Sequence, residues 1–333
     1  MAKVKYVGHL QDHEKEFLRL FNTLTYSRSA WQVWEDLMIV ISCSISNAVD
    51  RTPEKFKKRE TQYERSIKAL GGVDIPAQML GIITMALEEN PDQDFLGKFY
   101  MNLNLGSHWR GQFFTPYNMC RMISEMNFGD GTKAEIKRKG YMSVCDPCVG
   151  AGAMLIAAAN TLKKMGINYQ TDAVFVGQDI DRVVAMMAYI QLSLIGCPGY
   201  IIIGNSLTHP PVGHVLFPQD TEGREIWITP LFMHKVWEQQ RTKVLMQKLF
   251  RGTETTQKTV ETEKGGVSMN NAKPGRQRIR NLLFKLNDED RNTLVCLIAK
   301  AGYSVRIGKE RPEGRGQTQY FVEFWEESDN DNV

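Results

Sequence analysis

The chain has 333 residues, of which 42% are hydrophobic and 24% charged, so it contains enough apolar material for one large domain with one or two smaller ones. Its formal charge of +3 and isoelectric point near 8.4 are too mild to indicate a nucleic-acid partner on net charge alone. No apolar run approaches the roughly 18 residues of a membrane span, and the amino terminus lacks the apolar core of a signal peptide, so we expect a cytoplasmic protein with no membrane partner.

The amino-terminal part has a helical pattern. Apolar residues recur at helical spacing between about residues 13 and 89, as at Phe17 and Phe21. Residues 94–105 continue this pattern, and little in the region resembles a strand. We predict an N-terminal helical domain over residues 1–105.

The next region alternates short apolar strands with helices. Candidate strands lie at residues 141–145, 173–176, 200–203 and 225–228, and candidate helices at 153–165, 182–195 and 236–250. Such alternation indicates a parallel sheet covered on both faces. The sequence therefore predicts an α/β fold, a doubly wound and mostly parallel sheet, over residues 106–251.

The carboxyl-terminal part divides into a polar segment and a small folded piece. Residues 252–278 are rich in Thr, Lys, Glu, Gly and Asn, which is typical of a flexible linker or loop. Residues 279–333 contain a candidate helix at 288–301 and candidate strands at 303–307 and 318–325. We predict a small helix plus β-hairpin for this end piece.

A glycine loop between a strand and a helix is the strongest local feature. The segment Asp146-Pro-Cys-Val-Gly-Ala-Gly152 follows an apolar strand and precedes a helix rich in Ala and Leu. Gly150 and Gly152 allow the backbone to pass close to a ligand at the carboxyl ends of the strands, where doubly wound sheets bind ligands. One strand later, Asp179 can accept hydrogen bonds from two ribose hydroxyls, while Asp179 or Asp181 caps the following helix. The pattern suits a nucleoside cofactor.

Cysteine spacing indicates no metal site. Cys145 and Cys148 form a Cys-x-x-Cys pair, but the sequence has no second such pair to complete a zinc site.

Four segments in this order resemble the DNA amino-methyltransferases, and among them the modification subunits of type I restriction systems. Gly111 to Tyr117 is similar to the family's segment upstream of the glycine loop, and Asp146 to Gly152 to its Asp-Pro-x-x-Gly-x-Gly loop. Gly177 to Asp181 resembles the acidic segment, and Gly204 to Leu207 the adenine-side segment. The resemblance covers about residues 94–232.

The resemblance implies that S-adenosylmethionine is the cofactor and that the α/β domain has the methyltransferase fold. The residues it implies at the cofactor are Phe114, Thr115, Pro116, Asp146, Pro147, Gly150, Gly152, Asp179, Ile180 and Asn205. By this likeness, residues 114–116 pack around the methionine part and Asp146 meets its amino group. Asp179 holds the ribose, and Asn205 lies near the adenine ring.

Amino-methyltransferases also carry Asn or Asp, then Pro-Pro and an aromatic residue, after the fourth strand. The oxygens accept hydrogen bonds from the target amine, and the aromatic ring stacks on the flipped base. This sequence contains no Asn-Pro-Pro or Asp-Pro-Pro. Thr208 to Pro211 has a double proline but follows the third strand. The segment after the candidate fourth strand keeps one proline and the aromatic, so we assign the acceptor role to Thr229, Pro230 and Phe232.

Two functions follow from these observations. The first is an S-adenosylmethionine-dependent methyltransferase that is specific for the exocyclic amine of adenine in DNA, with an unusual acceptor loop. The second is a catalytically inactive cofactor-binding or DNA-binding subunit of a restriction-modification-like complex. The sequence leaves both open.

Double-stranded DNA is the expected macromolecular partner. Basic clusters lie at residues 55–59, 133–139 and 273–280, and each is also typical of a solvated surface. The third adjoins the polar segment, so we assign DNA binding to Arg276, Arg278 and Arg280. No target-recognition domain is recognisable. Either a partner, a specificity subunit or a second methyltransferase subunit, therefore supplies sequence specificity, or the enzyme is only weakly selective.

Overall fold

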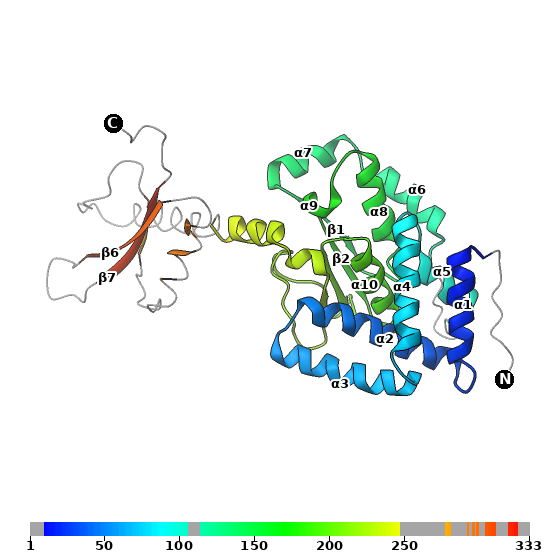
Figure 1. Cartoon of the computed structure of the whole chain (residues 1–333). Coiled ribbons are helices and arrows are strands. Elements are labelled where there is room, and N and C mark those ends of the chain that lie inside the picture. Colours follow the sequence, from blue (N-terminus) through cyan, green and yellow to red (C-terminus); the bar gives the residue numbers. More distant parts are fainter. Residues whose placement is uncertain are drawn as a thin grey trace. The chain divides into compact units, whose positions relative to one another are not determined.

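The computed structural model describes residues 10–105, 114–246, 277–280, 292, 295–296, 298–299, 304–310 and 319–325. The chain divides into two compact units, Met1–Trp237 and Glu238–Val333. Figure 1 shows the elements of both units.

Seven of the described helices precede the first strand of the sheet, and the first five lie within residues 1–105. These five are α1 (Asp12–Leu24), α2 (Ala30–Val49), α3 (Pro53–Leu70), α4 (Asp74–Glu89) and α5 (Phe95–Asn102). The helix α2 begins where the Ser29 hydroxyl accepts a hydrogen bond from the Gln32 N–H, and α3 ends at Gly71 in the left-handed region. The helices α2 and α3 lie side by side (Figure 1).

The sheet has four strands in the order β1 (Met142–Asp146), β2 (Ala173–Asp179), β3 (Gly199–Ile203) and β4 (Glu225–Ile228). The first three strands are parallel, and β4 runs antiparallel to β3. The other elements are α6 (Tyr117–Asn127), α7 (Asp130–Lys139), α8 (Ala153–Lys164), α9 (Tyr169–Asp172), α10 (Arg182–Leu194), η2 (Pro230–Met233) and a helical stretch at 235–246. All four predicted strands of this region are confirmed.

The two faces of the sheet are covered differently. The helices α8 and α10 connect parallel strands that follow one another in one direction, so right-handed crossovers place both helices on the same face. On the opposite face, the Tyr200 ring lies 5.9 Å from the Phe232 ring, which lies 6.0 Å from the Trp237 ring. This face is thus covered in part by the chain that follows β4.

Two expectations about the architecture are corrected. The α/β class with a mostly parallel sheet after a helical region is confirmed, but the described strand order never reverses, so the described sheet is not doubly wound. The helices within residues 1–105 also do not form a separate domain, because Phe17 and Trp34 share one hydrophobic core with Leu155 and Tyr189 of the sheet region. The compact units separate after Trp237 rather than after residue 251.

The second unit contains a three-stranded antiparallel sheet in the order β5 (Gln277–Arg280), β7 (Gln319–Trp325) and β6 (Ser304–Glu310). The predicted hairpin corresponds to β6 and β7. The strand β5 begins within the segment 252–278 that the sequence predicted as linker, and residues 252–276 lie outside the described part of the chain. A small core of Met246, Ile298, Val322 and Phe324 packs in this unit.

No single helix in the described part of the chain is long and apolar enough to cross a membrane. The helices α3 and α4 meet the criteria of length and composition only when taken together, and they are bent by 105° at the break between them.

Candidate cofactor site

The glycine loop lies at the carboxyl end of β1. Two of its residues have positive φ angles, Gly150 at 56° and Gly152 at 97°, a region that side chains with a Cβ rarely adopt. A Cβ at Gly152 would lie 3.2 Å from the Ala188 Cα, which belongs to the backbone of α10. Glycine is therefore required both for the turn and for the close approach of α8 to α10.

Hydrogen bonds tie this loop to the end of β2. The Val149 N–H donates to the Gln178 carbonyl at 2.9 Å, and the Gly150 N–H donates to Asp179 Oδ2 at 3.0 Å. A Cβ at Gly177 would come within 2.7 Å of the Val149 side chain, so this strand residue must also be small. The loop and the acidic segment thus form one structure.

Asp179, the last residue of β2, and Asp181, two residues later, have different roles. Asp181 caps α10, since its Oδ1 accepts hydrogen bonds from the Val183 and Val184 N–H groups at 2.9 and 3.2 Å. Asp179 Oδ1 accepts from the Asp181 N–H at 2.9 Å, and its Oδ2 accepts from Gly150. Because each carboxylate oxygen has two lone pairs, Asp179 keeps acceptor capacity for two hydroxyls.

The carboxyl groups of Asp146 and Asp179 both have a raised pKa. Burial raises the pKa of the Asp146 carboxyl, the Cys148 N–H bond to its Oδ1 opposes this, and the nearby Asp179 charge raises the pKa further. Burial also raises the pKa of Asp179. A cationic group placed here would relieve both effects, which fits the ammonium and sulfonium charges of S-adenosylmethionine.

The segment before α6 lies beside the loop. A Cβ built on Gly150 would lie 3.5 Å from the Phe114 ring, and that ring stacks on Tyr100 at 5.5 Å between centroids. The Thr115 carbonyl accepts from Cys120 Sγ at 3.7 Å, while the Thr115 and Pro116 side chains are exposed. Residues 106–113, which include the first three of the seven residues of the upstream motif, lie outside the described part of the chain.

The end of β3 completes the site. The Gly204 N–H donates to the Asp179 carbonyl at 2.9 Å, which places Asn205 next to the end of β2. Asn205 Oδ1 accepts from the Leu207 N–H at 2.9 Å and from the Thr208 N–H at 3.3 Å, so it holds a turn. Ile180 is 69% exposed at the same edge. The structure therefore brings the predicted cofactor residues together at one edge of the sheet.

The model of the N-6 DNA methylase family matches residues 93–262, just over half of the 333 residues. The chain belongs to the N-6 DNA methylase family. This family consists of methyltransferases, and its cofactor, S-adenosylmethionine, is the cofactor of this chain.

Other comparisons add little to the family assignment. The search of curated proteins found no match. Among solved structures, the chain is similar to a protein described as a class I S-adenosylmethionine-dependent methyltransferase from Listeria monocytogenes. The two are 13% identical, with a TM-score of 0.35, over 96% of this chain and 90% of that one. A likeness of this size carries no argument about the site.

The predicted acceptor segment does not lie at the cofactor edge. In the β3–β4 pair, Ile228 lies opposite Tyr200, near the amino end of β3, whereas Asp179 lies opposite Ile203 at its carboxyl end. The expectation that the strand 225–228 ends beside the glycine loop is wrong, because β4 runs antiparallel to its neighbour.

The contacts of this segment are those of a buried structural turn. The Thr229 hydroxyl donates to the Cys197 carbonyl at 2.8 Å and accepts from the Gly199 N–H at 2.9 Å. Thr229 and Phe232 are each 1% exposed, and Pro230 opens η2. Neither the place nor the contacts of these residues fit an acceptor for a flipped base.

The alternative acceptor segment, Thr208 to Pro211, does lie at the cofactor edge. However, the His209 carbonyl accepts from Gln178 Nε2 at 3.0 Å, and the Pro210 carbonyl accepts from Arg224 Nη1 at 2.8 Å. Both carbonyl oxygens therefore already have a donor within the fold.

Sequence reasoning missed two residues behind the glycine loop. Gln191 of α10 donates from Nε2 to the Ala151 carbonyl and to Asp94 Oδ1, each at 2.8 Å. Asp94 in turn caps α5 by accepting from the Gly97 N–H at 2.9 Å. The acidic residue three positions before a glycine was the available signal for Asp94, and no local signal marked Gln191.

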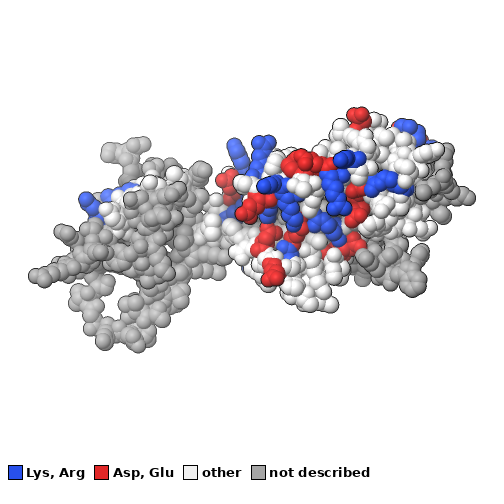
Figure 2. All heavy atoms as spheres, turned by 90° about the horizontal axis from the view of Figure 1, so that it is seen from below, with Lys and Arg blue, Asp and Glu red and all other residues white. Residues whose placement is uncertain are grey.

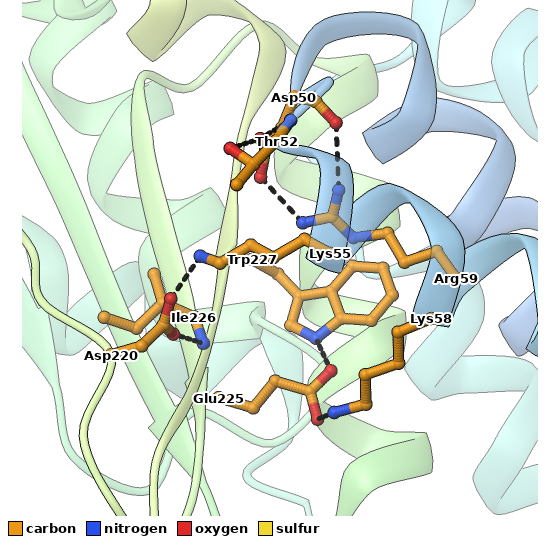
Figure 3. Close-up of polar contacts among 9 residues, drawn as sticks. All are labelled: Asp50, Thr52, Lys55, Lys58, Arg59, Asp220, Glu225, Ile226 and Trp227. Atoms are coloured by element: carbon orange, nitrogen blue, oxygen red, sulfur yellow. Dashed lines mark hydrogen bonds and ion pairs between the residues drawn. The ribbon is translucent and has the colours of Figure 1, made fainter.

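The basic cluster at residues 55–59 forms ion pairs within the fold. Three of its four basic side chains pair with carboxylates: Lys55 with Asp220, Lys58 with Glu225 at 3.0 Å, and Arg59 with Asp50 at 2.7 Å. Figure 3 shows Lys55 and Lys58 joining α3 to the loop before β4 and to β4, whereas Arg59 joins α3 to Asp50, which directly follows α2. The pairing argues against this cluster as a phosphate-binding surface.

Trp227 is at the centre of this network (Figure 3). The Arg59 and Arg182 guanidinium carbons lie 5.2 and 5.7 Å from the Trp227 ring centroid, a cation–π arrangement. Trp227 Nε1 donates to Glu225 Oε1 at 3.0 Å. Burial favours a higher pKa for Glu225, but its bonds to Arg182 and Lys58 outweigh burial and lower it.

The remaining basic residues are distributed over both units. Figure 2 shows a face on which Lys and Arg side chains are interspersed with Asp and Glu. In the second unit, Arg278 and Arg280 of β5 lie opposite Glu323 and Phe321 of β7 in the register. Arg276 lies outside the described part of the chain.

Proposed function

We propose that this chain binds S-adenosylmethionine at the glycine loop and takes part in methyl transfer to the exocyclic amine of adenine in double-stranded DNA. The observation that carries the proposal is the pair of carboxylates at the ends of neighbouring parallel strands. Asp146 and Asp179 flank the loop, both have a raised pKa, and Asp179 retains acceptors for ribose hydroxyls. When bound, S-adenosylmethionine supplies an electrophilic methyl group.

Different residues of the site would contact different parts of the cofactor. Asp146 would meet the ammonium group, and Asp179 the ribose. Phe114, Thr115 and Pro116 would pack around the methionine part, because Phe114 lies against Gly150. Ile180, with most of its side chain exposed, would cover the adenine ring, and Asn205 would shape the turn beside it.

DNA recognition is the second part of the proposal. An enzyme that modifies a base takes it out of the stack, so the duplex must lie across the cofactor edge. Arg278 and Arg280 both belong to β5, and we retain them as phosphate contacts. Arg276 would extend this set.

A second function is favoured by one specific observation. The acceptor segment around Thr229 is buried at the far end of the sheet, and in the loop 208–211 the His209 and Pro210 carbonyls already accept hydrogen bonds. A cofactor-binding subunit of a larger restriction-modification-like complex, with the acceptor on a specificity subunit or a second methyltransferase subunit, would need neither segment for chemistry.

One experiment separates these functions. The protein is incubated with S-adenosylmethionine labelled in its methyl group and with mixed-sequence DNA, and the digested nucleosides are separated by mass. Labelled N6-methyladenine with the wild type and none with Asp179→Ala supports an active methyltransferase. Cofactor binding by calorimetry without any labelled nucleoside supports the subunit. Label on RNA or protein alone contradicts the proposed substrate.

A further inference from the structure

The side chain of Gln191 occupies a joint between three parts of the chain. It is 0% exposed, and it links α10 to the glycine loop and to the first turn of α5. Its Nε2 donates to the Ala151 carbonyl and to Asp94 Oδ1, each at 2.8 Å, while its Oε1 accepts from the Leu96 N–H at 3.0 Å.

The amide of Gln191 has only one orientation that fits these partners. Two of them are oxygen acceptors and one is an N–H donor, so an exchanged O and N would place oxygen against oxygen twice. Both amide protons and one acceptor position are therefore used. A residue without this donor and acceptor set leaves at least the Ala151 carbonyl without its side-chain donor.

Asp94 fixes the other end of the joint. Its Oδ1 accepts from Gln191 and from the Gly97 N–H, which makes it the cap of α5. A Cβ on Gly97 would lie 2.0 Å from Asp94 Oδ2, so the glycine makes room for the carboxylate.

We propose that Gln191 is a positioning residue for cofactor binding, which with Asp94 sets the conformation of the glycine loop from behind. The proposal rests on the proposed cofactor site, because Ala151 lies between the two glycines of that loop. Through Ala151, the joint determines where the Val149 and Gly150 N–H groups point, and Gly150 is the residue that binds Asp179. Gln191 itself touches no reacting atom in this account.

The chain offers a matched control in Asn160. This residue is also a buried side-chain amide on a core helix, 6% exposed on α8. Its Nδ2 donates to the Pro91 and Ile156 carbonyls, each at 2.9 Å, so it ties the same stretch before α5 to a different helix. No hydrogen bond joins it to the glycine loop in the described part of the chain.

The test compares Gln191→Met with Asn160→Leu, two substitutions of similar size that remove buried amide hydrogen bonds. Affinity for S-adenosylmethionine is measured by calorimetry well below both melting temperatures. We expect Gln191→Met to weaken binding by about tenfold, the factor that one hydrogen bond to a buried group is worth. Asn160→Leu should stay within about twofold of wild type. Equal weakening by both variants, or none by Gln191→Met, overturns the proposal.

A second measurement does not depend on the cofactor. In the free protein, amide hydrogen exchange at Val149 and Gly150 reports how firmly the loop is held. Gln191→Met should speed exchange at these two amides by about tenfold relative to Asn160→Leu. Unchanged exchange in Gln191→Met overturns the proposal that Gln191 holds the glycine loop, whether or not the protein binds the cofactor. Faster exchange in this variant, together with a wild-type protein that does not bind the cofactor, would count against the proposed function alone.

Discussion

Gly152→Ala tests whether the glycine loop is built for a close approach. Gly152 has a φ of 97°, and an L-residue in the left-handed region costs roughly 1–2 kcal/mol. The added Cβ would also lie 3.2 Å from the Ala188 Cα, where overpacking against a helix backbone costs typically about 1–3 kcal/mol. The expected loss of unfolding free energy is therefore about 2–5 kcal/mol.

Gly166→Ala is the matched control for this prediction. Gly166 has a φ of 73° and nothing within 4 Å of its added Cβ, so it carries the backbone cost alone, about 1–2 kcal/mol. The entropic effect of replacing glycine in the unfolded chain is the same for both variants and cancels in the comparison.

Urea unfolding followed by circular dichroism, with calorimetric titration of S-adenosylmethionine, measures both effects. Gly152→Ala should lose about 1–3 kcal/mol more than Gly166→Ala, and it alone should bind the cofactor about tenfold more weakly. If the two variants differ by less than about 0.5 kcal/mol and bind the cofactor equally, the packing argument for this loop is refuted.

Three further predictions follow from the charged groups. Because burial and the neighbouring carboxylate raise the pKa of Asp146, Asp146→Asn should keep or raise the melting temperature of the cofactor-free protein at neutral pH while it weakens cofactor binding. That gain should vanish as the pH falls through the raised folded-state pKa, where the wild-type carboxyl is itself protonated, and a gain that grows in acid would contradict the assignment. Arg59→Met breaks a buried ion pair and should lower the free energy of unfolding in urea by about 3–5 kcal/mol. The control Lys57→Met, at an exposed position of the same helix, should lower it by less than about 0.5 kcal/mol. Similar losses in the two variants would show that the ion pair does not stabilise the fold. Replacing Arg278 and Arg280 by Gln should make the slope of log Kd against log salt concentration for DNA binding shallower by about 2, about one for each lost phosphate contact. Fluorescence anisotropy at several salt concentrations measures this slope, and an unchanged slope would exclude β5 from the interface.

The arrangement of the glycine loop and Asp179 was predictable because its signals are local. A strand, a turn with glycines at 150 and 152 and a following helix occupy one continuous segment, and Asp179 ends the next strand. Such spacing determines the positions of these residues at the edge of a parallel sheet without knowledge of the rest of the chain. The alternation of apolar segments likewise predicted the bounds of β1, β3 and β4 to within one residue, but it ended β2 three residues too early.

The acceptor side was not predictable for a topological reason. The segment 225–228 was recognised as a strand, but its direction depends on the long connection after β3 and on pairs that cross the chain. Lys58 of α3 and Arg182 of α10 both bind Glu225 at the start of β4. Contacts between residues so far apart in the sequence leave no periodic signal, and the same holds for Gln191 and Asp94.

The doubly wound arrangement was inferred from strand and helix alternation alone. Alternation predicts parallel neighbours and right-handed crossovers, which β1, β2 and β3 confirm. It contains no information on whether the strand order reverses, because a reversal depends on which edge the next strand joins. Here the next described strand, β4, joins beside β3.

Calorimetric titration of S-adenosylmethionine into the wild type and Asp179→Ala tests the central claim most directly. With the lost ribose contacts worth about 1.5–3 kcal/mol for each hydrogen bond to a charged group, the variant should bind at least about tenfold more weakly than a wild type that binds one cofactor per chain. Equal affinity of the two proteins, at equal thermal stability, would contradict the placement of the cofactor between the glycine loop and the end of β2.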